Sequence, residues 1–386
     1  MTFIPTRAAG LDQLMAFVGR AGRDYAETRN FDHGPENRTN VSQLSPYLRY
    51  RLITEDEVVA AVRSRHPGDT ADKFVQEVLW RTYWKGWLAL RPSVWTTYLA
   101  DVERLDEQTG GWRRDYEKAI AGRTGIDCFD AWIGELIEHG YLHNHARMWL
   151  ASIWIFTLRL PWQLGAALFW RHLLDGDPAS NTLSWRWVAG LQTVGKTYLA
   201  QGDNIARYTG GRFNPVGLAT RAAALEAPAS PLPVLLALPD PVPAGRIGLL
   251  LGEDDLTPET LALGDAKVVA TASLGGDFGR SRSVEAFVSE ALGDALSRAA
   301  AAFAVPGASL PDATVAAVGS WAAVHGIERI AVAYPPTGPG ASRLAALSDS
   351  LRLQGVTVHS VRRRWDVEAW PHAQRGFFAF RERFRT

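Results

Sequence analysis

Apolar side chains recur at three- and four-residue spacing through the first 215 residues, the pattern of helices that bury one face. The clearest runs predict helices over residues 70–90, 127–139 and 142–160. Asp127 and Asp130 stand at the start of the second run and are candidate caps. We therefore expect this part of the chain to form a mostly helical domain.

The most apolar stretch, residues 148–170, is long enough to raise the question of a membrane span. Arg159, Pro161 and Gln163 lie near its middle, where a bilayer would penalise their polar groups. Proline also interrupts a helix because it lacks the backbone N–H. The stretch is therefore predicted to form two buried core helices separated at Pro161, with no membrane association.

The pattern changes after residue 215. Residues 216–245 are rich in Ala, Pro and Leu, as in PASPLP and PDPVPAG, which predicts a linker. Beyond them, short apolar runs typical of buried strands alternate with helical stretches, as in parallel α/β domains. The predicted strands are residues 246–251, 267–272, 327–333 and 356–361, and the predicted helices are 284–303 and 341–353. The expected fold class is multidomain α and α/β: an all-helical domain over 1–215, a linker over 216–245 and a small parallel, Rossmann-like α/β domain over 246–386.

Composition narrows the classes of function. The 386 residues include 41 basic and 41 acidic ones, so no global field attracts nucleic acid, and DNA binding would need a local patch. The one cysteine, Cys128, excludes a disulfide framework, a cysteine-based zinc site and a four-cysteine iron–sulfur cluster, and it fits a reducing cytoplasm. The N-terminus has no signal-peptide features. The 15 tryptophans are unusual, although a tryptophan-rich core explains most of them.

One segment, residues 175–187, combines an acidic turn with an asparagine and two tryptophans: DGDPASNTLSWRW. The turn alone is ordinary loop chemistry. The whole segment closely resembles the flavin-binding signature of DNA photolyases and cryptochromes. The resemblance implies that Asp175 and Asp177 hold the ribityl chain and ring edges of FAD and that Asn181 faces the reactive flavin nitrogen N5. It further implies that Trp185 delivers an electron to the flavin and that Trp187 packs against a DNA lesion.

Residues 140–148, GYLHNHARM, are similar to another segment of the same family. On a helix, Asn144 and Met148 share a face, which in the family looks toward the lesion and the adenine of FAD. By resemblance, Arg147 pairs with Asp175. His145 stands where many cyclobutane-dimer photolyases carry an arginine that contacts DNA phosphate, so this sequence departs from the family there.

The histidines of this region have an alternative interpretation. His139 and His143 are spaced i, i+4, as on a zinc-binding helix, and His145 follows closely. No acidic residue lies between the first two as in HExxH motifs, and His145 would lie on another face. We therefore expect no metal site.

Residues 73–87, KFVQEVLWRTYWKGW, place Glu77, Trp80, Arg81 and Trp84 on one helical stripe. An amphipathic core helix with a Glu77–Arg81 pair at i, i+4 explains the stripe without any function. The segment also resembles the family's ELxWREFY helix. There the glutamate hydrogen-bonds the dimer bases, the tryptophan stacks on them and the arginine approaches the cofactor.

Residues 42–47, SQLSPY, resemble the family segment that binds the FAD phosphates, and hydroxyls with backbone amides at a helix start suit a pyrophosphate. An N-cap serine alone is commonplace. The preceding YAETRN matches a segment whose tyrosine contacts the phosphate side of FAD and whose arginine contacts DNA. The residues that carry these expected roles are Ser42, Gln43, Leu44, Ser45, Tyr25 and Arg29.

Trp162 matches the middle tryptophan of the family's electron-transfer chain, and Trp112 is a candidate for the outermost member.

The C-terminal part offers no independent nucleotide fingerprint: GGDFG at 275–279 is not a GxGxxG, and PPTGPG lacks a P-loop lysine. Its pattern is similar to the antenna domain of photolyases, which in the family precedes the helical domain. The chain is therefore expected to be circularly permuted, and its short α/β part makes an antenna chromophore doubtful.

The resemblance implies light-driven repair of cyclobutane pyrimidine dimers, a carbon–carbon lyase activity in which reduced FAD lends an electron to a flipped-out dimer. Asn144 stands where (6-4) photolyases carry a histidine, which argues against that lesion. The alternative is a cryptochrome-like photoreceptor, and a third possibility is a flavoprotein without a light-dependent role. We expect a cytoplasmic monomer whose partner is DNA containing pyrimidine dimers.

Overall fold

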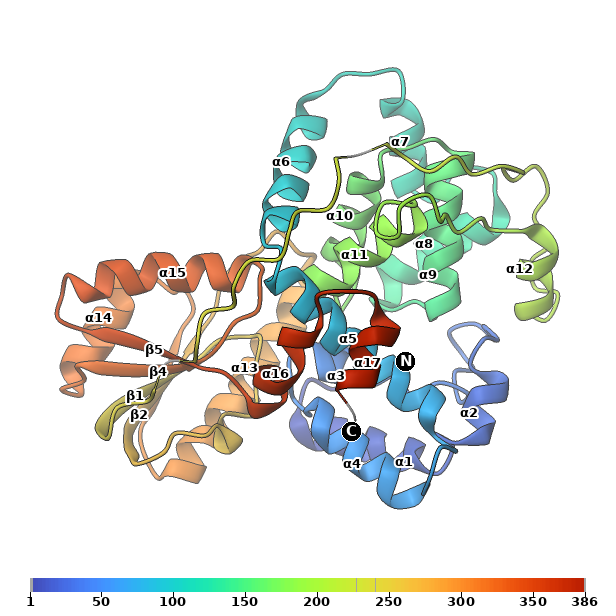
Figure 1. The fold of residues 1–386 in the computed structure, drawn as a ribbon. Helices are drawn as coiled ribbons and strands as arrows, with labels where there is room; N and C mark the ends of the chain where they lie inside the picture. The colour runs from blue at the N-terminus through green and yellow to red at the C-terminus, as the bar shows by residue number, and fades with distance from the viewer. Residues whose placement is uncertain (1–2, 227, 240, 385–386) are drawn as a thin grey trace.

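The computed structural model describes residues 3–226, 228–239 and 241–384. Its first part is helical, as predicted (Figure 1). One π-helical turn, Ile153–Thr157, interrupts this part. The helices are α1 (Arg7–Val18), α2 (Arg23–Thr28), α3 (Ser45–Arg49), α4 (Glu55–Arg65), α5 (Asp72–Ala89), α6 (Ser93–Glu107), α7 (Arg113–Ile120), α8 (Asp127–His139), α9 (Asn144–Ser152), α10 (Trp162–His172), α11 (Pro178–Val188) and α12 (Gly202–Tyr208).

Helix α8 has the predicted bounds, and it ends at Gly140, whose φ of +63° is the left-handed conformation that glycine favours. The two aspartates do not cap it as expected. Its N-cap is Ile126, and Asp130 instead accepts hydrogen bonds from the backbone N–H groups of Thr124 and Gly125 in the preceding turn.

The single helix predicted over 142–160 is wrong. Helix α9 begins only at Asn144, because the His143 side chain caps it by accepting from the backbone N–H of His145. After the π-helical turn, Arg159 adopts a left-handed φ of 55° and Pro161 precedes α10. The predicted break at Pro161 is therefore confirmed. No helix among the described residues has the length and apolar character needed to cross a bilayer.

The second part is a five-stranded parallel sheet in the order β3-β2-β1-β4-β5. Alternate side chains of its strands face two separate cores, as expected for a sheet covered on both sides. Ile247, Leu249 and Leu251 pack with α13, whereas Leu250 packs with α14 and α15. The elements are β1 (Gly245–Leu251), β2 (Ala266–Leu274), α13 (Arg282–Phe303), β3 (Gly307–Leu310), α14 (Val315–Val324), β4 (Arg329–Ala333), α15 (Pro339–Arg352) and β5 (Thr357–Val361), with a short 3₁₀ turn at Pro258–Thr260.

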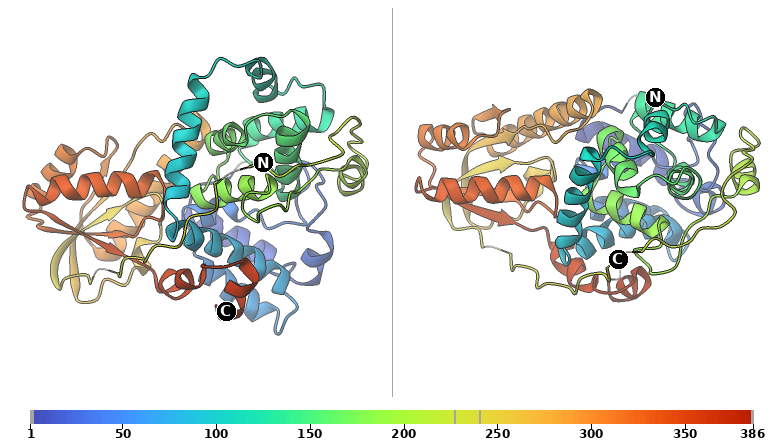
Figure 2. Two further views of the ribbon diagram at one scale, coloured as in Figure 1. Left: turned by 45° about the horizontal axis from the view of Figure 1, so that its top comes forward. Right: turned by 90° about the horizontal axis from the view of Figure 1, so that it is seen from above.

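The chain does not end on the sheet. After β5, α16 (Arg364–Ala369), a 3₁₀ turn (Trp370–His372) and α17 (Phe377–Arg383) return to the helical part and pack against α5, as the red segment in Figures 1 and 2 shows. Trp370 is buried there, and Gly86 of α5 allows the close approach, since a Cβ on it would lie 3.0 Å from the Trp370 Cα. The helical part precedes the sheet in the sequence, whereas the domain bounds and the circular permutation stay predictions.

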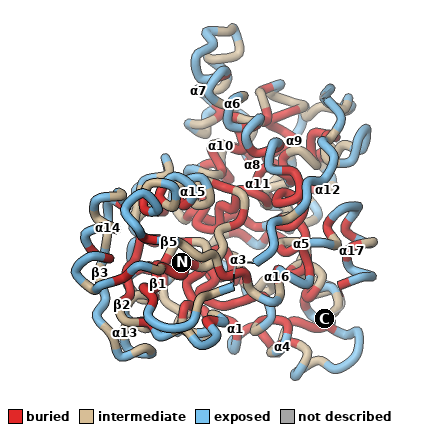
Figure 3. The backbone as a smooth tube through the Cα atoms, turned by 60° about the vertical axis from the view of Figure 1, so that its left-hand side comes forward, coloured by how far each residue is buried: buried red, intermediate tan, exposed pale blue. Residues whose placement is uncertain are grey.

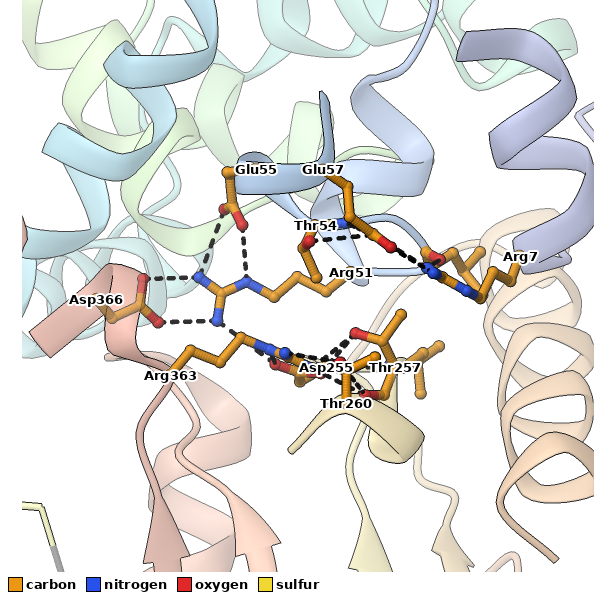
Figure 4. Close-up of polar contacts among 12 residues, drawn as sticks. Arg7, Arg51, Thr54, Glu55, Glu57, Asp255, Thr257, Thr260, Arg363 and Asp366 are labelled. Carbon is orange, nitrogen blue, oxygen red and sulfur yellow. Dashed lines mark hydrogen bonds and ion pairs between the residues drawn. The ribbon is translucent and has the colours of Figure 1, made fainter. Parts of the chain in front are cut away.

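A polar network joins the sheet to the helical part (Figure 4). The Arg51 guanidinium donates to both carboxylate oxygens of Asp366 at 2.7–2.8 Å and to Glu55 at 3.0 Å. Arg363 donates to Asp255, which follows β1, at 2.7 Å. Figure 3 shows the backbone around α5, α10 and α11, in the middle of the helical part, as largely buried.

Candidate cofactor site

The acidic turn before α11 is buried and held from two sides. Asp175 is 5% exposed and accepts two hydrogen bonds from Arg147, at 3.0 and 2.9 Å. The predicted Arg147–Asp175 ion pair is therefore confirmed. Burial by itself raises the pKa of Asp175, but Arg147 and the Ser45 hydroxyl outweigh it and hold that pKa below its usual value. Asp175 is consequently a buried, paired carboxylate.

Asp177 is the N-cap of α11, and its Oδ1 accepts from the backbone N–H of Ser180 at 2.7 Å. Pro178 occupies the first turn, where a missing N–H costs nothing. Burial opposes ionisation of Asp177, but nearby Lys85, Arg81 and Arg49 lower its pKa to about 2. The Asp177 carboxylate therefore lies within a ring of cations.

Several buried polar atoms around this turn have no hydrogen-bond partner among the described residues. They include Asp177 Oδ2, Arg81 Nη1, Ser180 Oγ and Thr182 Oγ1. Arg81 Nη1 lies 3.8 Å from Asp177 Oδ2, too far for a hydrogen bond. Because buried polar groups are nearly always paired, this cluster is suited to a polar ligand with both donors and acceptors.

Two further groups of predicted residues meet this turn. Ser45, the first residue of α3, places its hydroxyl on Asp175. Before it, Gln43 is buried with a left-handed φ of 55°, Leu44 is the N-cap of α3, and Ser42 Oγ accepts from the Leu44 N–H at 3.4 Å. The predicted phosphate-binding segment and the acidic turn are thus neighbours.

Asn181 is nearly buried on the first turns of α11. Its Nδ2 donates to the Ala166 carbonyl of α10 at 2.8 Å, which fixes the side-chain amide. The position that the family resemblance assigns to flavin N5 is therefore occupied by an oriented amide.

Two basic residues that the sequence did not single out are central to the site. Arg49 is 1% exposed, and its Nε donates to the Gly176 carbonyl at 2.7 Å. Its other nitrogens donate to Glu253 and Asp254 after β1, at 3.0 and 2.8 Å. Lys85 is also buried, which lowers its pKa. Arginines in YLRYRL and the EDD run after β1 are the signals, but their pairing is visible only in three dimensions.

Glu77 and Arg81 do not pair with each other, so the simple i, i+4 explanation of the α5 stripe is wrong. Glu77 forms an ion pair with Arg29, whose guanidinium lies 5.8 Å from the centre of the Tyr25 ring. Burial raises the pKa of the Tyr25 hydroxyl, which keeps it protonated. Arg81 reaches toward Asp177 instead.

His145 lies within an aromatic cluster instead of projecting toward solvent. Its ring stacks on Tyr208 at 5.9 Å and contacts Trp149 at 5.4 Å. Burial and the neighbouring Arg29 lower its pKa to about 4, so it is neutral at pH 7. On the same helix Asn144 is exposed and Met148 half-buried. Among the described residues, no group of three or more His, Cys, Asp or Glu side chains could hold a metal ion.

The predicted electron-transfer tryptophans lie on adjacent helices. Trp185 of α11 is buried and packs on Gly165 of α10, three residues after Trp162. The rings of Trp185, Trp154, Tyr116 and Trp112 follow one another at 6.0–6.1 Å, and this series of ring contacts does not include Trp162.

Trp162 stacks on Tyr98 at 5.7 Å and lines a cavity of about 760 Å³, which Trp112 and Arg186 also line. Trp187, the second tryptophan of the signature, is half-buried and stacks on Tyr198 at 5.7 Å.

Residues 74–221 match the family model described as the FAD binding domain of DNA photolyase. This part of the chain is similar to the FAD-binding domains of DNA photolyases. The cofactor of the family is FAD, and the acidic turn, the cations around it and its unpaired polar atoms fit that group. Asp177, Arg81, Asn181 and Ser45 are the residues that would hold it.

Curated proteins and a solved structure are similar to part of the chain. The deoxyribodipyrimidine photo-lyase of Streptomyces griseus is 34% identical over 180 residues, covering 42% of this chain and 38% of the relative. That of Thermus thermophilus is 32% identical over 224 residues, covering 55% of this chain and 49% of the relative. A class III photolyase structure from Agrobacterium tumefaciens has 28% sequence identity and a TM-score of 0.45, covering 53% of this chain and 43% of that one. The chain spans less than half the length of these relatives.

Proposed function

We propose that this protein repairs cyclobutane pyrimidine dimers in DNA, driven by light. When bound, reduced FAD would supply the photoexcited electron that splits the dimer and then takes it back. The observation that carries the proposal is the arrangement of α5. Arg81 and Lys85 on this helix reach the Asp177 site, while Glu77 and Trp80, one turn earlier, keep part of their surface exposed. A base bound at Glu77 and Trp80 would lie beside the cofactor.

In the proposed complex, polar and apolar side chains would take different parts in binding a flipped dimer. Glu77, paired with Arg29, offers carboxylate oxygens that accept from base N–H groups. Exposed Asn144 offers both a donor and an acceptor, whereas Trp80, Met148 and Trp187 supply apolar walls. Unstacking costs least at a damaged step, so such a pocket selects lesions over intact bases.

The test is loss of dimers from an oligonucleotide incubated with the purified, reduced protein under blue light, with a dark sample as control. We expect dimers to disappear only in the light. The variant Glu77→Gln, which keeps the shape and removes the charge, should lower the repair yield about tenfold, equivalent to one lost charge-assisted hydrogen bond of roughly 1.4 kcal/mol. Unchanged dimers in illuminated wild-type samples would refute the proposal.

A cryptochrome-like photoreceptor is the second candidate, favoured by the half-buried, neutral His145 in place of a phosphate-binding arginine. It predicts light-driven flavin reduction without any repair. The variant Trp162→Phe separates the steps: it should slow photoreduction of oxidised protein and leave repair by chemically reduced protein unchanged. We further propose that the protein is cytoplasmic and monomeric. Sedimentation with and without DNA would test whether it is a monomer.

A further inference from the structure

We propose that the C-terminal helix α17 forms part of the DNA-binding surface: its inner face backs Trp80, and its outer arginines contact phosphates beside the flipped dimer. This inference rests on the proposed function. It concerns a segment that lies outside the matched residues 74–221 and follows the sheet in the sequence.

The inner face of α17 meets the predicted lesion pocket directly. The Phe377 ring stacks on Trp80 with ring centroids 3.7 Å apart and an angle of 9° between the planes. Phe377 is 3% exposed and also contacts Tyr83 edge-on at 5.7 Å. Trp80 keeps part of its surface exposed. Phe377 therefore fixes the orientation in which Trp80 is presented to a base.

The helix is anchored and is not a loose tail. The Tyr83 hydroxyl donates to the Arg375 carbonyl at 2.8 Å, and Arg91 donates to the Gln374 carbonyl at 2.8 Å. Farther along, Phe380 and Phe384 are buried. A segment held at this many points is a fixed wall of the site.

The outer face of α17 carries unpaired positive charge. Arg381 and Arg383 of α17 are exposed, as is Arg375 just before the helix, and none of the three forms an ion pair with another residue that the structure describes. Glu382 is the one acidic residue of α17. Near the predicted lesion pocket, His145 is neutral and Arg29 forms an ion pair with Glu77, so neither offers a free positive charge. Free guanidinium groups next to a base-stacking tryptophan fit a nucleic-acid backbone.

The experiment measures binding of the flavin-loaded protein to dimer-containing and intact duplex DNA as a function of salt. Each arginine that contacts a phosphate contributes about 0.9 to the slope of log K against log salt. The double variant Arg381→Ala/Arg383→Ala should therefore reduce the slope by up to about two and weaken binding to both DNAs. The control Arg364→Ala removes an exposed arginine that Glu368 already pairs, and it should leave the slope unchanged.

A second comparison tests the stacking of Phe377 on Trp80, with Phe377→Leu as the variant and Phe378→Leu as its control. Phe378 is the neighbouring ring, 65% exposed, and its loss should be neutral. Phe377→Leu should reduce the preference for dimer DNA several-fold without reducing flavin content, which reports that the protein is folded. Unchanged slopes in the double variant, or tighter dimer binding by Phe377→Leu, would overturn the inference. A wild type without dimer preference would instead overturn the proposed function.

Discussion

At the scale of single residues, the site depends on two buried carboxylates with different partners. Asp175 forms a bidentate pair with Arg147, whereas Asp177 caps α11 and keeps one oxygen without a hydrogen bond. A paired carboxylate positions the turn. A carboxylate with an unused oxygen among cations remains available to a ligand.

Asp175→Asn should destabilise the fold by about 3 kcal/mol, because it leaves the Arg147 guanidinium without its counter-charge. The displaced turn should also weaken FAD binding by at least about tenfold, or 1.4 kcal/mol. Chemical denaturation and flavin titration measure the two effects. Asp127→Asn, an exposed change on α8, is the control, and equal behaviour of both variants would contradict the role of the pair.

The neutral His145 predicts that the stability of the fold depends on pH. Burial lowers the pKa of His145 to about 4, below its usual value near 6.5, so the unfolded chain takes up the proton first and stability falls from pH 6.5 toward pH 4. Glu135 contributes the opposite dependence of stability on pH, since burial raises its pKa to about 7. The informative quantity is therefore the difference in free energy of unfolding between wild type and the His145→Asn variant. This difference should fall by roughly 1–3 kcal/mol between pH 7 and pH 4.5. A difference that does not vary with pH would contradict this.

At the scale of elements, the contact of α10 with α11 sets the place of Trp185. A Cβ on Gly165 would lie 2.3 Å from the Trp185 ring, so only glycine fits there. Gly165→Ala should destabilise the protein by about 1–3 kcal/mol and change the photoreduction rate. Gly134→Ala, at an exposed position of α8, meets nothing within 4 Å and should be neutral or stabilising. Equal effects of the two variants would show that the packing at Gly165 is unimportant.

The sequence predicted the helices and strands whose bounds are set by nearby residues. The bounds of α8 follow from periodicity and Gly140, and the strands from short apolar runs. The residues between Val305 and Ile327 form β3 and α14, which were missed because a four-residue edge strand and an Ala-rich helix leave weak patterns.

Only part of the candidate site could be predicted from the sequence. The family resemblance led to the Arg147–Asp175 pair, whose members are only 28 residues apart in the helical part. The clamp by Arg49 and the stacking of Phe377 on Trp80 were not predicted, because their partners are far apart in sequence. Such contacts depend on how the sheet docks, which no periodicity encodes.

At the scale of the whole molecule, Arg49 connects the cofactor turn to the sheet. It binds the Gly176 carbonyl together with Glu253 and Asp254. Arg49→Met should cost about 3–5 kcal/mol, because buried Asp254 loses its cationic partner and Glu253 keeps only Arg280, and it should also lower flavin content. Arg104→Met, at an exposed position, is the control. Normal flavin content together with lost stability would show that the clamp serves the sheet alone.

The central claim is that the buried turn around Asp175 and Asp177 is an FAD site, and the most direct measurement is the flavin content of the gently purified protein. We predict a yellow protein that carries or takes up about one FAD per chain, and an Asp177→Ala variant that binds FAD far more weakly. A colourless wild-type protein that fails to bind added FAD would show that the buried turn is not an FAD site.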